Sequence, residues 1–272
     1  MTQTAHSFLD IACASAKEAG ALALSLQSRL QDIRYKGAKD LVTEADLACD
    51  RIIRERLSAA FPSHNLVTEE AADKAQGSEY TWYVDPIDGT INYSRGFPLW
   101  GVSIGLRQGD TTLCGAIYLP AFDHLYTCIR GGGAFCNGKP IHVTAQSDLS
   151  QAIISHGDFN VGSDENERRR LNEANFLARM RTVSLVQRVK CMGSAIVEGA
   201  YVASGRMEGY CMVVLNPWDV AVTTLLVTEA GGRVTTLRGE PWKYGDNNAL
   251  FSNGLLHDDL LASLEWDKTG TH

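Results

Sequence analysis

The sequence predicts an α+β fold in which helices and sheets form separate layers. Segments with helical and strand-like patterns are mixed along the chain without the strict alternation of a doubly wound sheet. Strand-like runs follow one another between residues 81 and 129, and most of the helix-like segments come after residue 165. With 272 residues, the chain is long enough for one large domain or for two tightly joined subdomains.

The first sixty residues predict two helices joined by a polar loop. Residues 6–30 are rich in Ala and Leu, with apolar residues at helical spacing. Residues 32–42 are polar, and a second helix is expected from near Thr43 to about Ala60. Thr43-Glu44-Ala45-Asp46 fits a helix-capping box, with Asp46 at the third helical position.

The rest of the chain predicts a series of strands and then a mixture of helices and strands. Gly131-Gly132-Gly133 and Asn137-Gly138 are turn signals, and Gly205 and Gly231-Gly232 fit the ends of two helices. The expected strands are 81–87, 99–107, 113–119, 124–129, 152–158, 233–238 and 249–252, and the expected helices are about 165–180, 193–205, 217–230 and 255–264.

The domain organisation expected from this pattern is one catalytic domain over residues 1–272. The polar, charged segment 160–171 is the best candidate for an internal boundary or a flexible loop. A division there would give two subdomains, one of about residues 1–150 that carries the metal and phosphate residues and one of about residues 151–272 that carries Asp219.

Composition narrows the class of protein. The chain is 44% hydrophobic and 21% charged, as expected of a soluble globular protein. A net charge of −7 argues against a nucleic-acid partner, because nucleic-acid binders usually carry a basic face. No apolar run approaches the roughly 20 residues of a membrane span, and no signal peptide is expected. Seven scattered cysteines without a C-x-x-C pair predict reduced thiols in a cytoplasmic protein.

Residues 82–90, Trp-Tyr-Val-Asp-Pro-Ile-Asp-Gly-Thr, are the most informative stretch for function. An apolar run ends in two carboxylates, Asp85 and Asp88, with Pro86 between them. Carboxylates held close together repel each other unless a cation lies between them, and Mg²⁺ prefers oxygen ligands. Gly89 and Thr90 suit a turn or helix start with free N–H groups, where a phosphate can bind. The pattern predicts metal-assisted phosphoester chemistry.

Four acidic residues are candidates for one metal site, although each has a simpler interpretation. Glu69 and Glu70 fit a solvated surface pair, Asp88-Gly89 fits an ordinary turn, and Asp219 fits a first-turn helix acid favoured by the helix dipole. Acidic residues are rarely buried without a partner. The candidate metal residues Glu69, Asp85, Asp88 and Asp219 all lie beside apolar residues.

Three other chemistries do not fit the residues. A phosphatase with an Asp-x-Asp-Gly-Thr nucleophile needs one residue between its carboxylates, whereas two residues separate them here and Pro86 stands in the nucleophile position. The triple glycine at 131–133 lacks the Lys and Ser/Thr of a phosphate-binding P-loop. The seven histidines show no metal-ligand spacing, which disfavours zinc.

Taken together, these segments resemble the inositol monophosphatase family, within the fructose-bisphosphatase-like superfamily of lithium-sensitive, Mg²⁺-dependent phosphatases. The matches extend over about residues 5–265 in a fixed order. They are Asp40-Leu-Val-Thr-Glu-Ala-Asp46, Glu69-Glu70, Asp85-Pro-Ile-Asp-Gly-Thr90 with Asn92 and Gly96-Phe-Pro98, Gly133-Ala-Phe with Asn137-Gly138, and Trp218-Asp219 before a helix that ends in Glu229-Ala-Gly-Gly232.

The resemblance implies a layered α/β/α/β/α fold and a role for each matched residue. Glu69, Asp85 and the carbonyl of Ile87 would hold one metal ion, and Asp85, Asp88 and Asp219 a second. A third, weaker Mg²⁺ would contact Glu69 through water, and Mn²⁺ is an alternative metal. The catalytic set would be Asp46, Thr90 and Glu69, with Asp46 and Thr90 orienting the attacking water. Asp88, Gly89, Thr90, Gly193, Ser194, Ala195 and Asp219 would bind the phosphate and the substrate.

The chain departs from the family pattern at two places. Members specific for inositol have a Glu seven residues before the Trp-Asp aspartate, to bind sugar hydroxyls, and this chain has Met212 there. A thioether is a weak hydrogen-bond acceptor, so this departure bears on which phosphomonoester is hydrolysed. The helix after Asp219 carries Val222 and Thr223, where the family commonly has small residues.

The expectation from the sequence is a cytoplasmic, homodimeric phosphomonoesterase acting on a small polyol or sugar-like phosphate, with inositol monophosphate the leading substrate. Histidinol phosphate, 3′-phosphoadenosine 5′-phosphate and fructose bisphosphate are the alternatives within the enzyme class. A protein-binding module with vestigial activity is the alternative outside it, and the intact set of matched acidic residues argues against that.

Overall fold

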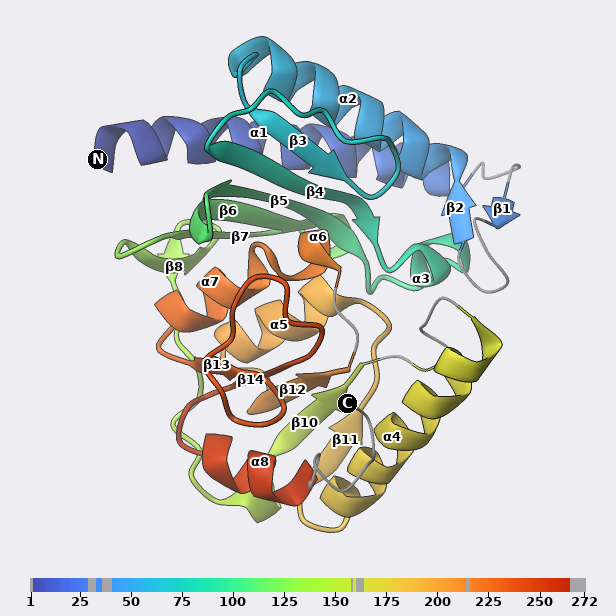
Figure 1. Cartoon of the computed structure of the whole chain (residues 1–272), viewed down its shortest axis with the longest axis vertical. Helices are drawn as coiled ribbons and strands as arrows, with labels where there is room; N and C mark the ends of the chain where they lie inside the picture. Colours follow the sequence, from blue (N-terminus) through green and yellow to red (C-terminus); the bar gives the residue numbers. More distant parts are fainter. Residues whose placement is uncertain are drawn as a thin grey trace.

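The computed structural model describes residues 2–28, 33–35, 41–157, 159, 164–213 and 216–264. Within these ranges the elements stack in five layers (Figure 1). From one side to the other, the layers are α1 (Thr2–Gln27) with α2 (Glu44–Ala60), a seven-stranded sheet, α5 (Ala195–Ala203) with α6 (Pro217–Val220) and α7 (Thr223–Glu229), a five-stranded sheet, and α4 (Glu165–Val183) with α8 (His257–Leu264). The predicted α+β fold with α/β/α/β/α layering is confirmed.

The seven-stranded sheet follows the chain in order, β3-β4-β5-β6-β7-β8-β9, and is antiparallel except for the parallel β3–β4 pair. Its strands are β3 (Asn65–Thr68), β4 (Tyr80–Asp88), β5 (Gly101–Gln108), β6 (Thr111–Leu119), β7 (His124–Ile129), β8 (Gly133–Cys136) and β9 (Lys139–Pro140). The turn signals at 131–133 and 137–138 join β7 to β8 and β8 to β9, as the sequence predicts.

The five-stranded sheet has the order β11-β10-β12-β14-β13, so it is assembled from segments that are distant in the chain. Its strands are β10 (Ile153–His156), β11 (Arg188–Lys190), β12 (Gly209–Met212), β13 (Arg233–Thr235) and β14 (Ala249–Ser252). A separate two-stranded pair, β1 (Ile33–Tyr35) with β2 (Leu41–Thr43), precedes α2, and the short helix α3 (Thr90–Ser94) follows β4.

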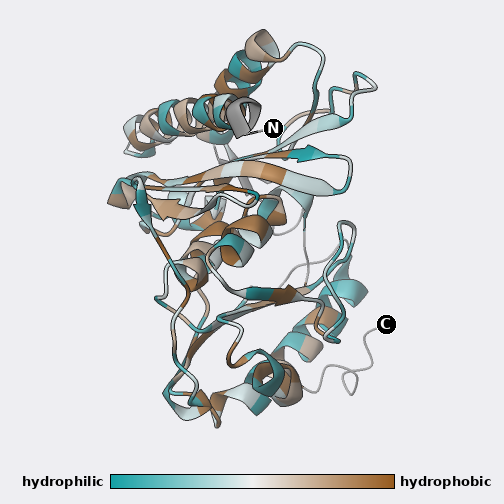
Figure 2. Cartoon of the chain, turned by 90° about the vertical axis from the view of Figure 1, so that its left-hand side faces the viewer, coloured by the Kyte–Doolittle hydropathy of each residue, from teal (hydrophilic) through white to brown (hydrophobic). Residues whose placement is uncertain are grey.

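Strand β4 divides its side chains between the two faces of the sheet, because successive residues of a strand point to opposite faces. Trp82 and Val84 pack in the core under α1 and α2, together with Ile104 of β5. Asp85 pairs with Ser103 and faces the layer that contains α6. Figure 2 shows apolar residues gathered on the strands and helices in the middle of the molecule, while the outer helices alternate between apolar and polar residues. One face of the sheet is therefore covered by α1 and α2, and the other face carries a polar site at the carboxyl end of β4.

Several boundaries differ from those expected. The segment expected as one helix over 217–230 is two helices, α6 and α7, separated at Ala221 and Val222. The polar loop expected over 32–42 contains β1 and β2, and its Lys36 and Asp40 lie outside the described residues. The structure also contains short strands of 3 or 4 residues that were not predicted, among them β3, β11 and β12. Residues 160–163 of the candidate boundary also lie outside the described residues, and α4 begins at Glu165.

Among the described residues, none of the helices combines the length and apolar character that crossing a membrane requires.

Candidate active site

Asp85 and Asp88 lie at the carboxyl end of β4, where the strand leaves regular pairing. The register between β4 and β5 shifts between these two residues, because Pro86 has no N–H to donate to the ladder. The backbone N–H of Ile87 donates to Oδ1 of Asp85 over 3.0 Å. This local irregularity brings both carboxylates to the same side of the sheet edge, although they are three residues apart.

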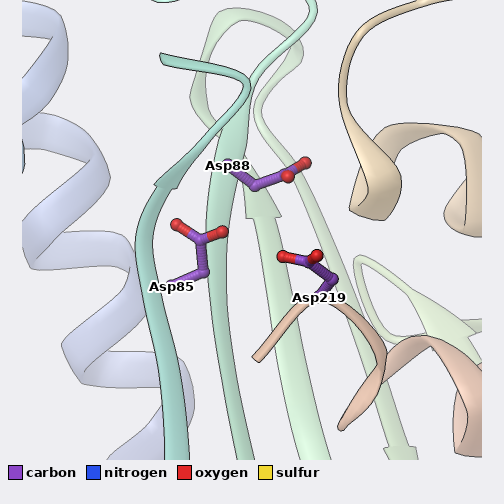
Figure 3. A group of neighbouring side chains, drawn as sticks. All are labelled: Asp85, Asp88 and Asp219. Atoms are coloured by element: carbon purple, nitrogen blue, oxygen red, sulfur yellow. The ribbon is translucent and has the colours of Figure 1, made fainter. Parts of the chain in front are cut away.

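Asp219 comes to the same place from the other half of the chain. It lies in the first turn of α6, where the N–H and the side-chain amide of Asn216 each donate to its Oδ2 over 3.1 Å. Carboxylate oxygens of Asp85, Asp88 and Asp219 lie within 4.8 Å of one another, and Figure 3 shows the three side chains converging from β4 and α6. Asp219 is therefore both a first-turn helix acid, as its simpler interpretation had it, and a member of the acidic cluster.

Glu69 lies next to this cluster because β3 runs parallel to β4. Its N–H donates to the carbonyl oxygen of Val84 over 3.2 Å, directly after the last paired residues of the two strands. Its negative charge contributes to raising the pKa values of Asp85, Asp88 and Asp219. The four acidic residues singled out in the sequence are thus brought together.

The electrostatics of the cluster fit a bound cation. Burial, with the charges of Glu69 and the neighbouring aspartates, raises the pKa of Asp85 well above its ordinary value. Burial likewise raises the pKa of Asp219 well above its ordinary value and that of Asp88 to about 6. Asp85 is 1% exposed. Buried carboxylates that repel one another offer only oxygen donors, and hard divalent cations such as Mg²⁺ prefer such donors.

Asp46 and Thr90 form a hydrogen-bonded pair at the edge of the cluster. The Thr90 hydroxyl lies 3.2 Å from Oδ1 of Asp46 and 3.0 Å from the carbonyl oxygen of Ile87. Asp46 also closes the predicted capping box of α2, because its Oδ2 accepts the N–H and the hydroxyl of Thr43. Burial raises the pKa of Asp46 to about 6. The capping role and the pairing with Thr90 use different carboxylate oxygens, so they are compatible.

Gly89 shapes the turn between β4 and α3. Its φ of 85° lies in the left-handed region, which favours glycine. A Cβ at this position would lie 2.9 Å from the carbonyl oxygen of Leu99 and 3.1 Å from Cβ of Ser194. The turn therefore packs directly on the segment 193–195, and the N–H groups of the first turn of α3 have no acceptor within that helix.

The segment Gly193-Ser194-Ala195 holds Asp88 as well as lining the site. The Ser194 hydroxyl and the N–H of Ile196, 3.1 Å away, both donate to Oδ2 of Asp88, and the backbone of Ala195 also lowers its pKa. Gly193 joins this segment to the first half of the chain, because its carbonyl oxygen accepts from the Asn92 side chain over 3.2 Å. The sequence predicted that this segment contacts the substrate but did not predict its contacts with Asp88 and Asn92.

A cavity of about 130 Å³ opens beside Asp88 and Asp219. Met212 of β12 lines it, so the position at which the sequence departs from the inositol-specific pattern does face the site. Glu198 and Tyr210 also line it and were not predicted. Glu198 is 1% exposed and accepts from the Ser155 hydroxyl over 2.5 Å and from the N–H of Met192 over 2.8 Å. A charged residue inside an otherwise apolar helix was the signal that could have identified it.

Comparison with known proteins agrees with this geometry. A model of the inositol monophosphatase family matches residues 4–269. The chain is 36% identical over 263 residues to inositol monophosphatase 2 of Solanum lycopersicum, which covers 94% of this chain and 97% of that protein. It is 37% identical over 232 residues to the fructose-1,6-bisphosphatase/inositol-1-monophosphatase of Aquifex aeolicus, covering 85% of this chain and 84% of that protein. The solved structure of an IMPase of Thermotoga maritima has a TM-score of 0.87 and 30% identity, covering 96% of this chain and 98% of that one. The chain therefore belongs to the inositol monophosphatase family of phosphatases.

Proposed function

We propose that this protein is a Mg²⁺-dependent phosphomonoesterase that hydrolyses a small polyol or sugar-like phosphate by direct in-line attack of water. The observation that carries the proposal is the convergence of Asp85, Asp88 and Asp219 within 4.8 Å, with Glu69 beside them and a cavity next to them. Membership of a metal-dependent phosphatase family supports it.

The residues that would hold the metal ions are those of the acidic cluster. Glu69, Asp85 and the carbonyl oxygen of Ile87 would hold one ion, and Asp85, Asp88 and Asp219 a second, with a third, weaker ion reached from Glu69 through water. When bound, Mg²⁺ lowers the pKa of a coordinated water and stabilises the charge that develops on the leaving oxygen. Mn²⁺, which also accepts oxygen ligands, is an alternative metal.

Asp46 and Thr90 would orient the attacking water and take up its proton. A hydroxyl has one proton, so Thr90 donates to one oxygen at a time. When Asp46 is ionised, donation to its Oδ1 is the stronger, charge-assisted bond. Oγ1 of Thr90 then has its lone pairs free to accept a proton from the water while the hydroxyl's own proton passes to Oδ1 of Asp46, which is the final acceptor. Glu69 would act from within the acidic cluster.

The N–H groups of Gly89 and Thr90 would bind the phosphate oxygens at the start of α3, which follows the left-handed turn at Gly89. Ser194 and Ala195 fix the carboxylate of Asp88 in place. These groups are fixed before substrate arrives, so little reorganisation is needed during the reaction.

The substrate alcohol would contact the cavity lined by Met212, Glu198 and Tyr210. One related protein is named for inositol phosphate alone, and another is named for both fructose 1,6-bisphosphate and inositol phosphate. We propose inositol monophosphate as the leading substrate and fructose bisphosphate, histidinol phosphate or 3′-phosphoadenosine 5′-phosphate as alternatives. Because Met212 stands where inositol-specific members have a Glu, this position offers no carboxylate to accept hydrogen bonds from sugar hydroxyls.

The test is phosphate release from a panel of these compounds and glycerol 2-phosphate, with Mg²⁺, with EDTA and with added Li⁺. We expect turnover that requires Mg²⁺, strongly favours one compound and is inhibited by Li⁺. Turnover of none of the compounds by folded protein that binds Mg²⁺ would contradict the proposed substrate class. Full activity in EDTA would contradict the metal mechanism.

Met212 can be tested directly by the substitution Met212→Glu. A hydrogen bond from a substrate hydroxyl to a carboxylate is worth about 1.5–3 kcal/mol, so kcat/KM for inositol 1-phosphate should rise roughly tenfold or more relative to phenyl phosphate, which has no hydroxyls. Met212→Gln is the matched control, since it places an uncharged side chain of similar size. An unchanged ratio of the two substrates in Met212→Glu would show that this position does not set specificity.

We also propose that the protein forms a homodimer in the cytoplasm through α4. Apolar side chains are exposed along one side of this helix, at Phe176, Leu177, Met180 and Val183, with Leu185 just beyond it. Seven free cysteines suit a reducing compartment. Sedimentation equilibrium should give a dimer for the wild type and a monomer for Met180→Glu. A monomeric wild type would reject the dimer.

A further inference from the structure

A second cavity lies on the same sheet face as the acidic cluster but further along the strands. Its volume is about 470 Å³, and it is enclosed by the ends of β5 and β6, by α7 and by the segment 242–244 (the strands and α7 are labelled in Figure 1). No residue lines both this cavity and the one beside Asp88. Arg107 pairs with Thr81, four residues before Asp85 on β4, which separates the two sites by about 13 Å along the strand.

Arg107 is the central group of this cavity. Arg107 is 2% exposed, and its Nε is buried without a hydrogen-bond partner. The guanidinium carbon lies 3.6 Å from the ring centroid of Tyr244, so one face of the group is covered by an aromatic ring. The carboxylate that neutralises it, Asp110, is 3.9 Å away and its side chain is 96% exposed. A buried guanidinium usually has a closely hydrogen-bonded acidic partner, and this one has only a distant, solvated one.

Other polar groups around the cavity also suit a negatively charged ligand. Arg130 is fixed at its edge by a bond from Nε to the carbonyl oxygen of Thr112 over 2.7 Å. The exposed Lys243 adds a third cation. The indole N–H of Trp242 is buried without a hydrogen-bond partner. Three cations, a single lining carboxylate and two buried unpartnered N–H groups make the cavity positive and rich in donors.

We propose that this cavity binds a small organic phosphate at a site separate from the candidate active site. The planar guanidinium of Arg107, with Arg130 and Lys243, suits a doubly charged phosphate group, which can accept several charge-assisted bonds at once. The volume is within the range of small-molecule sites and far exceeds what inorganic phosphate fills. The rings of Trp242 and Tyr244 offer apolar surface for the sugar or ring that carries the phosphate.

The experiment is calorimetric titration of the protein in EDTA with glucose 6-phosphate, inorganic phosphate and glucose. Without metal, the carboxylates of the candidate active site repel anions, and no hydrolysis is required for the readout. The outcome is therefore independent of the proposed phosphatase activity. Saturable binding of glucose 6-phosphate, tighter than that of inorganic phosphate and absent for glucose, is expected.

Variants assign the binding to this cavity. Lys243→Gln changes an exposed side chain and should weaken glucose 6-phosphate binding several-fold, while Arg107→Met should weaken it roughly tenfold or more. Lys139→Gln, an exposed lysine of β9 outside the cavity, is the matched control and should bind like the wild type. No saturable binding of glucose 6-phosphate, or binding that Lys243→Gln and Lys139→Gln affect equally, would overturn the proposal.

Discussion

Asp88 shows how a single residue of the site depends on both halves of the chain. The side chain comes from β4, but the donors to its Oδ2 are Ser194 and Ile196, from the segment that leads into α5. These donors hold the carboxylate in place, and one of its oxygens lies within 4.8 Å of carboxylate oxygens of Asp85 and Asp219. The orientation of Asp88 is therefore set by contacts more than a hundred residues away in the sequence.

Asp88→Asn should abolish most of the activity without unfolding the protein. The amide oxygen of Asn can accept the two bonds that Oδ2 accepts now, which turns the NH₂ group towards the cluster, where it repels a cation. Loss of several kcal/mol of metal-dependent stabilisation predicts a decrease in kcat/KM on the order of a thousandfold, measured by phosphate release. Stabilisation of the fold by Mg²⁺ should weaken in the same variant.

Asp259→Asn, an exposed first-turn acid of α8, is the control for Asp88→Asn and should behave as the wild type. If Asp88→Asn kept full activity and its stabilisation by Mg²⁺, Asp88 would not belong to a metal site.

Thr90→Ala should lower kcat and leave KM nearly unchanged, because it removes the hydroxyl that connects the water to Asp46. General acid–base groups typically contribute about 10²–10⁴-fold to the rate. Thr90→Ser keeps the hydroxyl and should retain most of the activity. Equal kcat values for the Ala and Ser variants would contradict this role, and steady-state kinetics at saturating Mg²⁺ distinguishes the outcomes.

At the scale of elements, the break between α6 and α7 follows from packing against the seven-stranded sheet. Val222 lies over Gly105 and Gly115, where an added Cβ would come within 2.9 Å and 2.7 Å of its side chain. Thr223 fits against Gly199 of α5 in the same way, with an added Cβ only 1.9 Å from its Cγ2. The bulkier residues that depart from the family pattern are therefore accommodated by glycines opposite them, and α6 still presents Asp219 to the cluster.

This complementarity predicts non-additive stability changes. Gly115→Ala should destabilise the protein by overpacking, by about 1–3 kcal/mol, and Val222→Ala should destabilise it by leaving a cavity, by a similar amount. The double variant should lose at least about 1 kcal/mol less than the sum of the two, because the new methyl group occupies the space that Val222 leaves. Urea denaturation measures all three, and strict additivity would contradict the proposed contact.

At the scale of the whole molecule, helices α5–α7 pack between both sheets, and the acidic cluster forms where the sheets and helices meet. We propose on this basis that the chain is one catalytic domain, with residues 1–150 and 151–272 as interdependent halves. The charge of the cluster then affects the stability of the entire fold, because separating the halves relieves the repulsion between their carboxylates.

The metal-free protein should therefore become more stable as the pH falls. The pKa values of Asp46 and Asp88 are raised from 3.8 to about 6 by burial, so the folded state binds more protons than the unfolded state between these values. The free energy of unfolding decreases as the pH rises through this window. Acidification from about pH 7.5 to about pH 5.5 in EDTA should stabilise the protein, by on the order of 1–3 kcal/mol.

Saturating Mg²⁺ should reverse this dependence, because protons compete with the metal for the same carboxylates. At about a hundredfold excess over Kd, the metal should add about 2.7 kcal/mol at neutral pH. The comparison is made by urea denaturation at each pH, with Asp88→Asn as the variant in which the pH effect in EDTA should shrink. If the metal-free wild type lost stability on acidification, the buried carboxylates of the cluster would not be the groups that determine the pH dependence.

The sequence alone was sufficient to predict the features that depend on contacts between residues near one another in the chain. The capping box Thr43-Glu44-Ala45-Asp46 and the long helix that it starts depend on contacts within a few residues, and so do the glycine turns between β7, β8 and β9. The order of Asp85, Asp88, Gly89 and Thr90 places two carboxylates and a left-handed turn at a strand end, whatever surrounds them. Local backbone geometry and the capping chemistry determined these features, so pattern and resemblance identified them.

Only the tertiary structure decided which residues surround the acidic cluster and hold it in place. Strand β12 has 4 residues and no readable period, yet it places Met212 and Tyr210 in the cavity. The contacts of Ser194 with Asp88, of Asn92 with Gly193 and of Glu198 with Ser155 join segments through packing between layers. The long-range energy of burying β4, α5 and α6 against one another fixes these partners. The residue types determine which chemistry is available, and the packing of the layers determines where these residues meet.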